Sequence, residues 1–131
     1  MTNEIRVKRL SEITAQASAA ITANTFSGGS QTVIGPSNAA GAAALDLYLD
    51  VTSAPSSAAY AEISRESSRE GTTYAAVEFV MRCPSVITTS AALYYVGRLW
   101  DPQAYEKIKV KAVNYGFTAS LIAVPILPEV Q

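Results

Sequence analysis

The stretch Tyr105-Glu-Lys-Ile-Lys-Val-Lys-Ala-Val-Asn114 alternates apolar and charged side chains. Successive side chains of an extended chain point to opposite faces, which gives this stretch one apolar face (Ile108, Val110, Ala112) and one basic face (Lys107, Lys109, Lys111). It therefore predicts a half-buried strand of an antiparallel sheet. An apolar run from Phe117 to Leu127 follows, and the intervening Asn114-Tyr115-Gly116 predicts a hairpin turn between the two strands.

The same alternation recurs upstream and predicts an all-β fold. Further strands are expected over residues 45–51, 59–64, 72–82 and 92–100, with Ala75, Val77, Phe79 and Met81 inward in the third of these. A glycine turn at residues 27–30 predicts a hairpin between residues 19–26 and 31–34. Because the chain has seven or eight such runs and no long helical pattern, we expect an antiparallel β-sandwich or a jelly-roll-like barrel.

Residues 1–24 carry a more ambiguous pattern. Leu10, Ile13, Ala17 and Ile21 recur at spacings of three and four, as on one face of a short amphipathic helix. The Ser and Thr content instead suits an extended arm that lies over a neighbouring subunit. We therefore predict an N-terminal arm or short helix over 1–24 and a β-domain over 25–131, with Ile5, Val7, Leu10 and Ile13 contacting a partner.

Composition argues against catalysis. The 131 residues include no histidine and a single cysteine, which removes the commonest general base and any multi-cysteine metal site. Cys83 is expected to be a buried packing residue. We therefore predict no catalytic, cofactor-binding or metal-binding residues, and no enzyme activity.

Charge and hydropathy bear on partners. A net charge of −1 gives no basic field for a nucleic acid, and the lysines of residues 107–111 are expected to form a solvated face paired with Asp46 and Asp50. The most apolar tract is too short for a membrane-spanning helix, and the first residues do not resemble a signal peptide. We expect neither a nucleic acid nor a membrane as partner.

Two groups of side chains are candidates for contact. Arg65, Glu66, Arg69 and Glu70 are expected in one polar loop, as inter-subunit ion pairs, as the rim of a ligand site, or as a solvated loop. Aromatic residues at outward positions are the second group, and they predict a carbohydrate-stacking platform, a protein interface, or a face covered by the N-terminal segment. These are Tyr48, Tyr60, Tyr74, Tyr94 or Tyr95, and Trp100.

The C-terminal half resembles a family of small structural proteins of tailed bacteriophages. The resemblance covers about residues 40–127 and is carried by Leu45-Asp-Leu-Tyr-Leu-Asp-Val51, the Ser-Arg-Glu-Gly turn at 68–71, Tyr95-Val-Gly-Arg-Leu-Trp-Asp-Pro102 and Lys107-Ile-Lys-Val-Lys-Ala-Val-Asn114. It implies a non-enzymatic virion protein without cofactors, foremost a capsid decoration protein that binds the major capsid protein as a homo-oligomer, with a trimer favoured. Such a protein is assembled in the host cytoplasm and resides in the virion.

Other functions remain open beside this one. A tail protein, a head–tail completion protein or a fibre base belongs to the same structural class. A carbohydrate-binding β-sandwich module would use the tyrosines and Trp100 as stacking surfaces. Within the decoration hypothesis, the expected contact residues are Ile5, Val7, Leu10, Ile13, Tyr48, Arg65, Arg69, Tyr74 and Trp100.

Overall fold

Eight strands and one short helix make up the computed structural model, which describes the backbone of residues 5–130 and the side chains of residues 8–128. The strands are β1 (Ile5–Arg9), β2 (Ile13–Ile21), β3 (Ala44–Ser53), β4 (Tyr60–Ser68), β5 (Glu78–Arg82), β6 (Ala92–Trp100), β7 (Tyr105–Val113) and β8 (Phe117–Val130), and the helix is α1 (Pro36–Ala39). The predicted all-β sandwich is confirmed.

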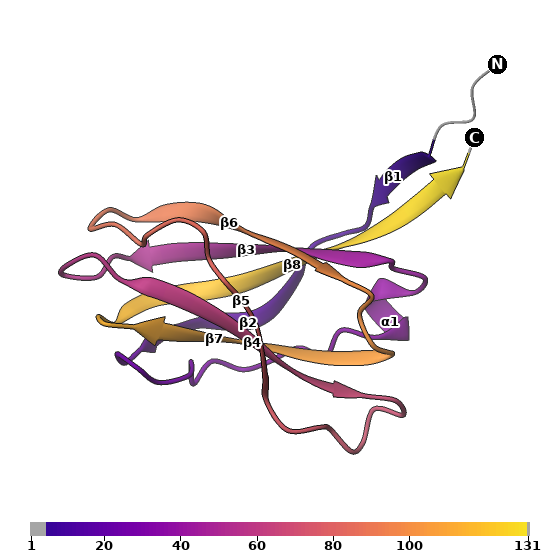
Figure 1. The fold of residues 1–131 in the computed structure, drawn as a ribbon, viewed down its shortest axis with the longest axis horizontal. Helices are drawn as coiled ribbons and strands as arrows, with labels where there is room; N and C mark the ends of the chain where they lie inside the picture. The colour runs from indigo at the N-terminus through magenta and orange to yellow at the C-terminus, as the bar shows by residue number, and fades with distance from the viewer. Residues whose placement is uncertain (1–4, 131) are drawn as a thin grey trace.

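The strands form two antiparallel sheets. In the large sheet the order is β1-β8-β3-β6, and β2 also pairs with β8; in the small sheet it is β5-β4-β7. Figure 1 shows β1 and the end of β8 projecting together from the body of the sandwich. The predicted hairpin between residues 105–114 and 117–127 is wrong, because β7 and β8 belong to different sheets. The turn at Asn114, with φ 79°, crosses between them.

The core lies between the sheets and is built from alternate residues of the central strands. Leu45, Leu47 and Leu49 of β3 are fully buried, as are Ile108 and Val110 of β7. Burying each of these side chains contributes about 1.5–3 kcal/mol, so the alternation in the sequence specifies which face of each strand turns inward. The inward set predicted for residues 105–114 is confirmed.

The N-terminal segment is part of the sandwich. The predicted helix is wrong, because residues 13–21 form β2, which pairs with β8. Register shifts interrupt β2 between Thr14 and Gln16 and between Gln16 and Ala19, and such bulges break the two-residue period that would have identified a strand. The boundary predicted at residue 24 does not separate two units, since β2 buries Ile13 and Ile21 in the common core.

Gln16 joins the two sheets on one side of the sandwich. Its side-chain oxygen accepts a hydrogen bond from the Val110 amide of β7 at 3.1 Å, and its side-chain nitrogen donates to the Ser27 carbonyl at 3.3 Å. The returning chain also bonds to β2, where the Ala17 amide donates to the Ser30 carbonyl at 2.8 Å. A Cβ at Gly29 would lie 2.3 Å from the Ala17 carbonyl oxygen, so this close return requires glycine. The predicted hairpin between residues 19–26 and 31–34 is wrong, because β2 ends at Ile21 and residues 30–32 instead bond back to Ala15 and Ala17 as an edge-covering loop.

Two further predictions fail around β4 and β5. Arg65 and Glu66 lie within β4, not in a loop, because the strand continues to Ser68. Val77 and Phe79 were expected inward, yet they are 44% and 57% exposed. The reason is that β5 begins only at Glu78 and shifts register against β4 between Ile63 and Ser64.

Candidate functional site

The outer face of the large sheet gathers exposed apolar and aromatic side chains. Tyr48 of β3 lies opposite Tyr95 of β6 and Ile122 of β8 in the strand register. We call this surface the aromatic face and define it by Tyr48, Leu93, Tyr95, Trp100, Ile122 and Val124. Leu93 and Trp100 are each 62% exposed and Tyr95 is 48% exposed, which makes this face unusually apolar for a solvent-facing sheet.

A bulge in β6 places these side chains on one face. Leu47 pairs with Gly97 while Tyr48 pairs with Tyr95, so Val96 is the additional residue. Tyr95 and Arg98 therefore both point outward, and Val96 and Leu99 are both buried. Gly97 has φ 153°, and a Cβ there would lie 2.9 Å from the Met81 sulfur, so the bulge depends on glycine.

Asp46 lies beneath this face and holds a charged cluster together. Its carboxylate accepts hydrogen bonds from Arg98 Nε at 2.8 Å and from Arg98 NH2 at 3.0 Å, the paired geometry that guanidinium and carboxylate groups favour. The Tyr95 hydroxyl donates to the same carboxylate at 3.2 Å, and Arg9 NH1 lies 3.4 Å from it. Asp46 is only 1% exposed, whereas the side chains of Arg98 and Arg9 are 27% and 54% exposed, so the cluster buries its anion and keeps one positive charge in excess near the surface.

The protonation states follow from these contacts. The hydrogen bond from Arg98 lowers the pKa of the Asp46 carboxyl, and this effect exceeds the opposing effect of burial. Burial, and after it the negative charge of Asp46, raise the pKa of the Tyr95 hydroxyl. Asp46 is therefore ionised and Tyr95 protonated at neutral pH. A carboxylate with a lowered pKa and both oxygens bonded to Arg98 is a poor proton acceptor for catalysis.

The rings of the aromatic face are ordered by the same cluster. Tyr48 and Tyr95 meet edge to face, with centroids 5.3 Å apart and planes at 61°. The Arg98 guanidinium lies 5.2 Å from the centroid of the Trp100 ring, and Arg9 NH1 is 3.4 Å from the Tyr48 hydroxyl. Because Arg98 is fixed by Asp46, the exposed Trp100 ring packs against a positioned cation.

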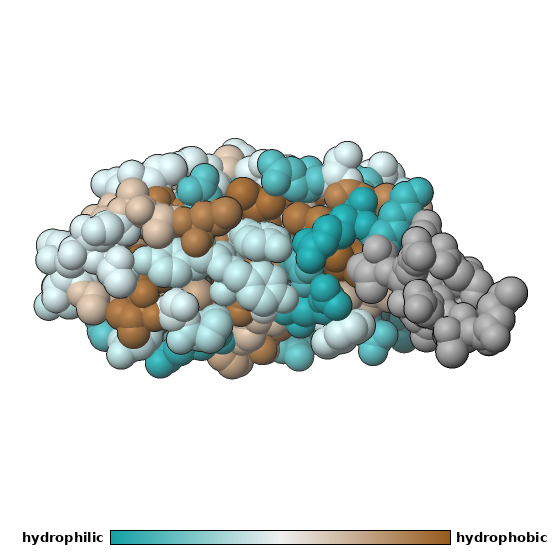
Figure 2. Space-filling view, turned by 90° about the horizontal axis from the view of Figure 1, so that it is seen from above, coloured by the Kyte–Doolittle hydropathy of each residue, from teal (hydrophilic) through white to brown (hydrophobic). Residues whose placement is uncertain are grey.

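A shallow groove crosses the aromatic face toward β1. It encloses about 360 Å³. Tyr48, Leu93, Ile122 and Val124 supply apolar walls, and Arg9, Leu10 and Glu12 complete the lining. In Figure 2, seen from the side on which β6 lies in Figure 1, apolar atoms emerge among polar ones, and strongly hydrophilic atoms gather toward the projecting strands. An apolar floor with one cation and one anion at its margin suits a polypeptide or another amphipathic partner.

The structure brings together only some of the predicted contact residues. Tyr48 and Trp100 lie on the aromatic face, and Leu10 borders its groove. Ile13 is 8% exposed and belongs to the core, so it is not available to a partner. Ile5 and Val7 lie on β1, and because their side chains are outside the described ones, their predicted contacts stay predictions.

The remaining predicted residues lie on or beside the small sheet. Arg65 of β4 forms an ion pair with Glu106 at 3.5 Å, Arg69 is exposed in the following turn, and the Tyr74 ring lies 4.1 Å from Lys107 Nζ. Sequence reasoning missed Arg98, Leu93, Ile122 and Val124. The sequence signals were weak: for Ile122 and Val124, the apolar character of β8, and for Arg98, its position between two aromatic residues.

The lysine side chains of β7 contact neighbouring residues on the outer side of the small sheet. Lys109 forms an ion pair with Glu66, and Lys107 packs against Tyr74. The predicted pairing of the lysines with Asp46 and Asp50 is wrong, because those carboxylates lie on β3 in the large sheet. All three lysines are half-buried; Lys109 has an acidic partner, while Lys107 and Lys111 lie against the aromatic rings of Tyr74 and Phe26.

Glu106 is a second buried carboxylate, and its pKa is shifted in the direction opposite to that of Asp46. It is fully buried, and one oxygen accepts a hydrogen bond from the Gln103 amide at 2.8 Å. Its other oxygen has no hydrogen-bond partner among the described residues. Burial raises the pKa of Glu106, and the Gln103 amide and Arg65 only partly oppose this. The two carboxylates therefore give stability contributions that depend on pH with opposite sign.

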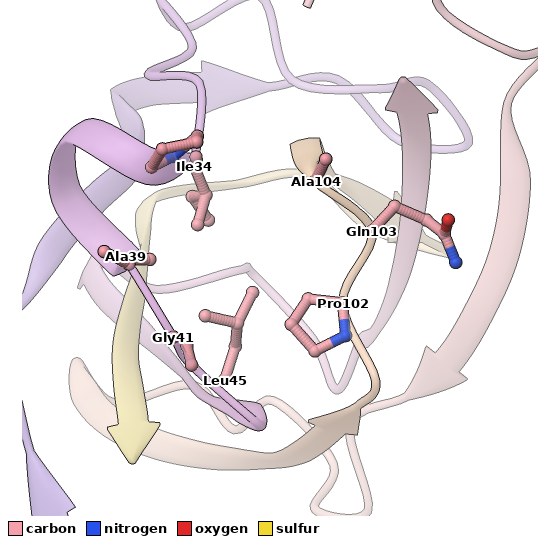
Figure 3. A pocket seen from close by; sticks show the side chains of 11 residues that line it. Ile34, Ala39, Gly41, Leu45, Pro102, Gln103 and Ala104 are labelled. Atoms are coloured by element: carbon pink, nitrogen blue, oxygen red, sulfur yellow. The ribbon is translucent and has the colours of Figure 1, made fainter. Parts of the chain in front are cut away.

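A pocket at the end of the sandwich beside α1 offers little chemistry. It encloses about 270 Å³ and is lined by small or apolar side chains, including Ile34, Leu45 and Pro102. Figure 3 shows Ile34 and Leu45 pointing into this space while the amide of Gln103 points away from it. The pocket presents hydrocarbon and no charged group.

Among the described side chains, those of residues 8–128, the structure shows no cluster of three or more histidine, cysteine, aspartate or glutamate residues placed to hold a metal ion. Over the same residues, no helix has the length and apolar character to cross a membrane. Cys83 is buried as predicted, and burial raises the pKa of its thiol. No protein-family model matches the sequence, and no curated protein matches it either.

Proposed function

We propose that this chain is a non-enzymatic structural protein of a tailed bacteriophage virion, foremost a decoration protein that binds the capsid shell. One observation carries the proposal: the aromatic face exposes large apolar side chains, while the Arg98 guanidinium beside them is paired with the buried Asp46 carboxylate. Protein interfaces share this arrangement, because aromatic anchors gain most when charges need not be stripped of water on binding. The resemblance of residues 40–127 to phage structural proteins supports the choice of partner.

The aromatic face supplies contact without chemistry. Leu93, Tyr95 and Trp100 can each bury further area against a partner, and Arg9 and Glu12 can set orientation at the margin of the groove. The partner proposed is the major capsid protein, with the chain present as a homo-oligomer, a trimer being favoured. Its place is then the virion, after assembly in the host cytoplasm. A tail protein, a head–tail completion protein or a fibre base would use the same face on another virion partner.

The test is co-sedimentation of the purified chain with capsid shells of the phage that encodes it, together with the mass of the free chain by light scattering. We expect saturable binding at a fixed ratio to the capsid lattice and a mass above that of the monomer. A strictly monomeric chain that does not bind the shells would contradict the decoration role. Binding to tails but not to shells would move the chain to the alternative virion site.

Carbohydrate binding is a second candidate, favoured by the rings at the groove. Tyr48 and Tyr95 border polar groups of Arg9 and Glu12, and sugar rings stack on such surfaces. Against this, the Arg98 guanidinium already packs on the Trp100 ring, which reduces the ring area free for a sugar. Titration of soluble oligosaccharides by tryptophan fluorescence separates the two functions: quenching that saturates would favour the glycan module, and an unchanged spectrum would favour the protein interface.

A further inference from the structure

The projecting ribbon formed by β1 and the end of β8 has a structural peculiarity. β1 pairs with β8 from Ile5 opposite Val130 to Arg9 opposite Ile126. On the other side of β8, pairing with β3 stops at Ala44, which lies opposite Ile126. Beyond that point the ribbon has only two strands within the described chain, as Figure 1 shows. A two-stranded ribbon is marginally stable by itself and gains from a third strand.

The two edges of the ribbon are not equivalent. The Ala43 amide donates to the Ile126 carbonyl at 2.9 Å, so Ile126 directs its backbone groups away from β1. Because these groups alternate along a strand, Pro128 faces the same side. Proline has no N–H, and the β8 edge therefore lacks a donor where an added strand would need one.

The outer edge of β1 keeps all its donors. The Leu10 amide donates to the Pro125 carbonyl at 2.9 Å, which fixes the alternation along β1. Lys8 then directs its backbone groups to β8, whereas Val7 and Arg9 direct theirs outward. By contrast, the outer edge of β2 is covered where the Thr32 amide donates to the Ala15 carbonyl at 3.0 Å. The edge of β1 is thus complete and, within the described residues, unpaired.

Charge restricts what can pair there. β1 has the sequence Ile-Arg-Val-Lys-Arg, with three cations and no acidic residue. The whole chain has ten Lys and Arg residues and eleven Asp and Glu residues. Without the three cations of β1, seven Lys and Arg remain against eleven Asp and Glu, which gives the rest of the chain a net charge of −4. Like charges directly opposite each other destabilise a strand pair, which disfavours pairing of β1 with β1 of a second copy. An acidic strand would instead gain opposite Arg6 and Lys8, whereas Arg9 already lies 3.4 Å from the Asp46 carboxylate.

We propose that the outer edge of β1 binds an extended, acidic segment of a partner protein by strand addition. The segment would exchange backbone hydrogen bonds with Val7 and Arg9 and place its carboxylates beside the cations of β1. Backbone pairing supplies affinity and charge supplies selectivity, as in other complexes that add a strand to a sheet edge. The proposal concerns the backbone edge of β1 and not the aromatic face; the two share Arg9, whose side chain lines the groove and lies 3.4 Å from the Asp46 carboxylate.

The test uses the full chain and a fluorescent acetylated peptide of alternating valine and glutamate, long enough to span β1. Fluorescence polarisation should show salt-sensitive binding that Val7→Pro weakens by about tenfold, since this substitution removes an outward N–H. Val7→Ala is the matched control: it keeps the N–H and should bind nearly as the wild type. Leu93→Ser on the aromatic face should also leave binding unchanged.

Three outcomes would overturn the proposal. The first is equal binding of a peptide in which lysine replaces glutamate. The second is equal binding of the valine–glutamate peptide after N-methylation along its bonding edge, because charge alone would then explain the affinity. The third is self-association that Val7→Pro abolishes, since the edge would then serve a second copy. Circular dichroism of each variant verifies that the sandwich itself is intact.

Discussion

The outer faces of the two sheets carry similar alternating sequences but handle their charges differently. On the small sheet, Lys109 pairs with Glu66, and charged groups share the outer face with the exposed rings of Phe26 and Phe79. On the large sheet, Asp46 draws Arg98 inward, and aromatic and aliphatic groups form the face. Surface pairs contribute little to stability or association, whereas a cluster of exposed apolar side chains can anchor a partner. The comparison therefore supports the proposal that the aromatic face of the large sheet is the binding surface.

The largest expected effect comes from a substitution in the core that the two sheets share. Val110→Asp should unfold the protein, because it places an unpaired charge at a fully buried position and costs more than about 4 kcal/mol. Lys109→Gln, one residue away on the outer face, removes the ion pair with Glu66 and should change stability by about 1 kcal/mol or less. Urea unfolding followed by tryptophan fluorescence measures both. Similar losses in the two variants would show that the inward and outward faces of β7 are misassigned.

A smaller effect separates the ion pairs of the two faces. Asp46→Asn should cost about 2–3 kcal/mol, since it leaves Arg98 without its counter-charge in a partly buried position. Glu66→Gln on the small sheet breaks a more exposed pair and should cost about 0–1 kcal/mol. The same urea titrations at neutral pH give both values. Equal losses of stability in the two variants would contradict the claim that the ion pairs of the two faces differ in burial.

The pH dependence sharpens the difference further. The pKa of Asp46 is lowered by folding, so its contribution to stability is present above its unfolded value, about 3.9, and is lost as pH falls through the folded pKa. The loss of stability caused by Asp46→Asn should therefore become smaller in acid.

The pKa of Glu106 is raised, so its contribution to stability is lost as pH rises through the folded pKa. Glu106→Gln should accordingly gain stability relative to the wild type as pH rises from about 4 toward neutrality. Parallel pH trends in the two variants would contradict the assigned burial and pairing.

The sequence predicts the core better than it predicts the site, and the reason is physical. The alternation of Ile108 and Val110 is local, and burial enforces it, so the inward face of β7 could be predicted. The bulge at Val96 depends on how β6 meets β3, and it moves Arg98 to the same face as Tyr95. The pairing of Asp46 with Arg98 likewise depends on cross-strand register, which residue spacing along one strand does not encode.

The same limit explains the N-terminal error. Bulges in β2 replaced strict alternation by spacings of three and four, which resemble a helix when the partner strand is unknown. Tyr48 and Trp100 could be predicted as contact residues because large aromatics at outward positions stand out in any register. Leu93 and Ile122 could not, since an apolar residue in a strand is expected to be buried.

The most direct test of the binding role compares two exposed apolar residues, one on each sheet. Leu93→Ser on the large sheet and Phe79→Ser on the small sheet alter side chains that are 62% and 57% exposed, so both should change stability by only about 0.5 kcal/mol. In co-sedimentation with capsid shells, Leu93→Ser should weaken binding about tenfold or more, while Phe79→Ser binds like the wild type. Unchanged binding by Leu93→Ser together with loss by Phe79→Ser would contradict the assignment of the aromatic face as the binding surface.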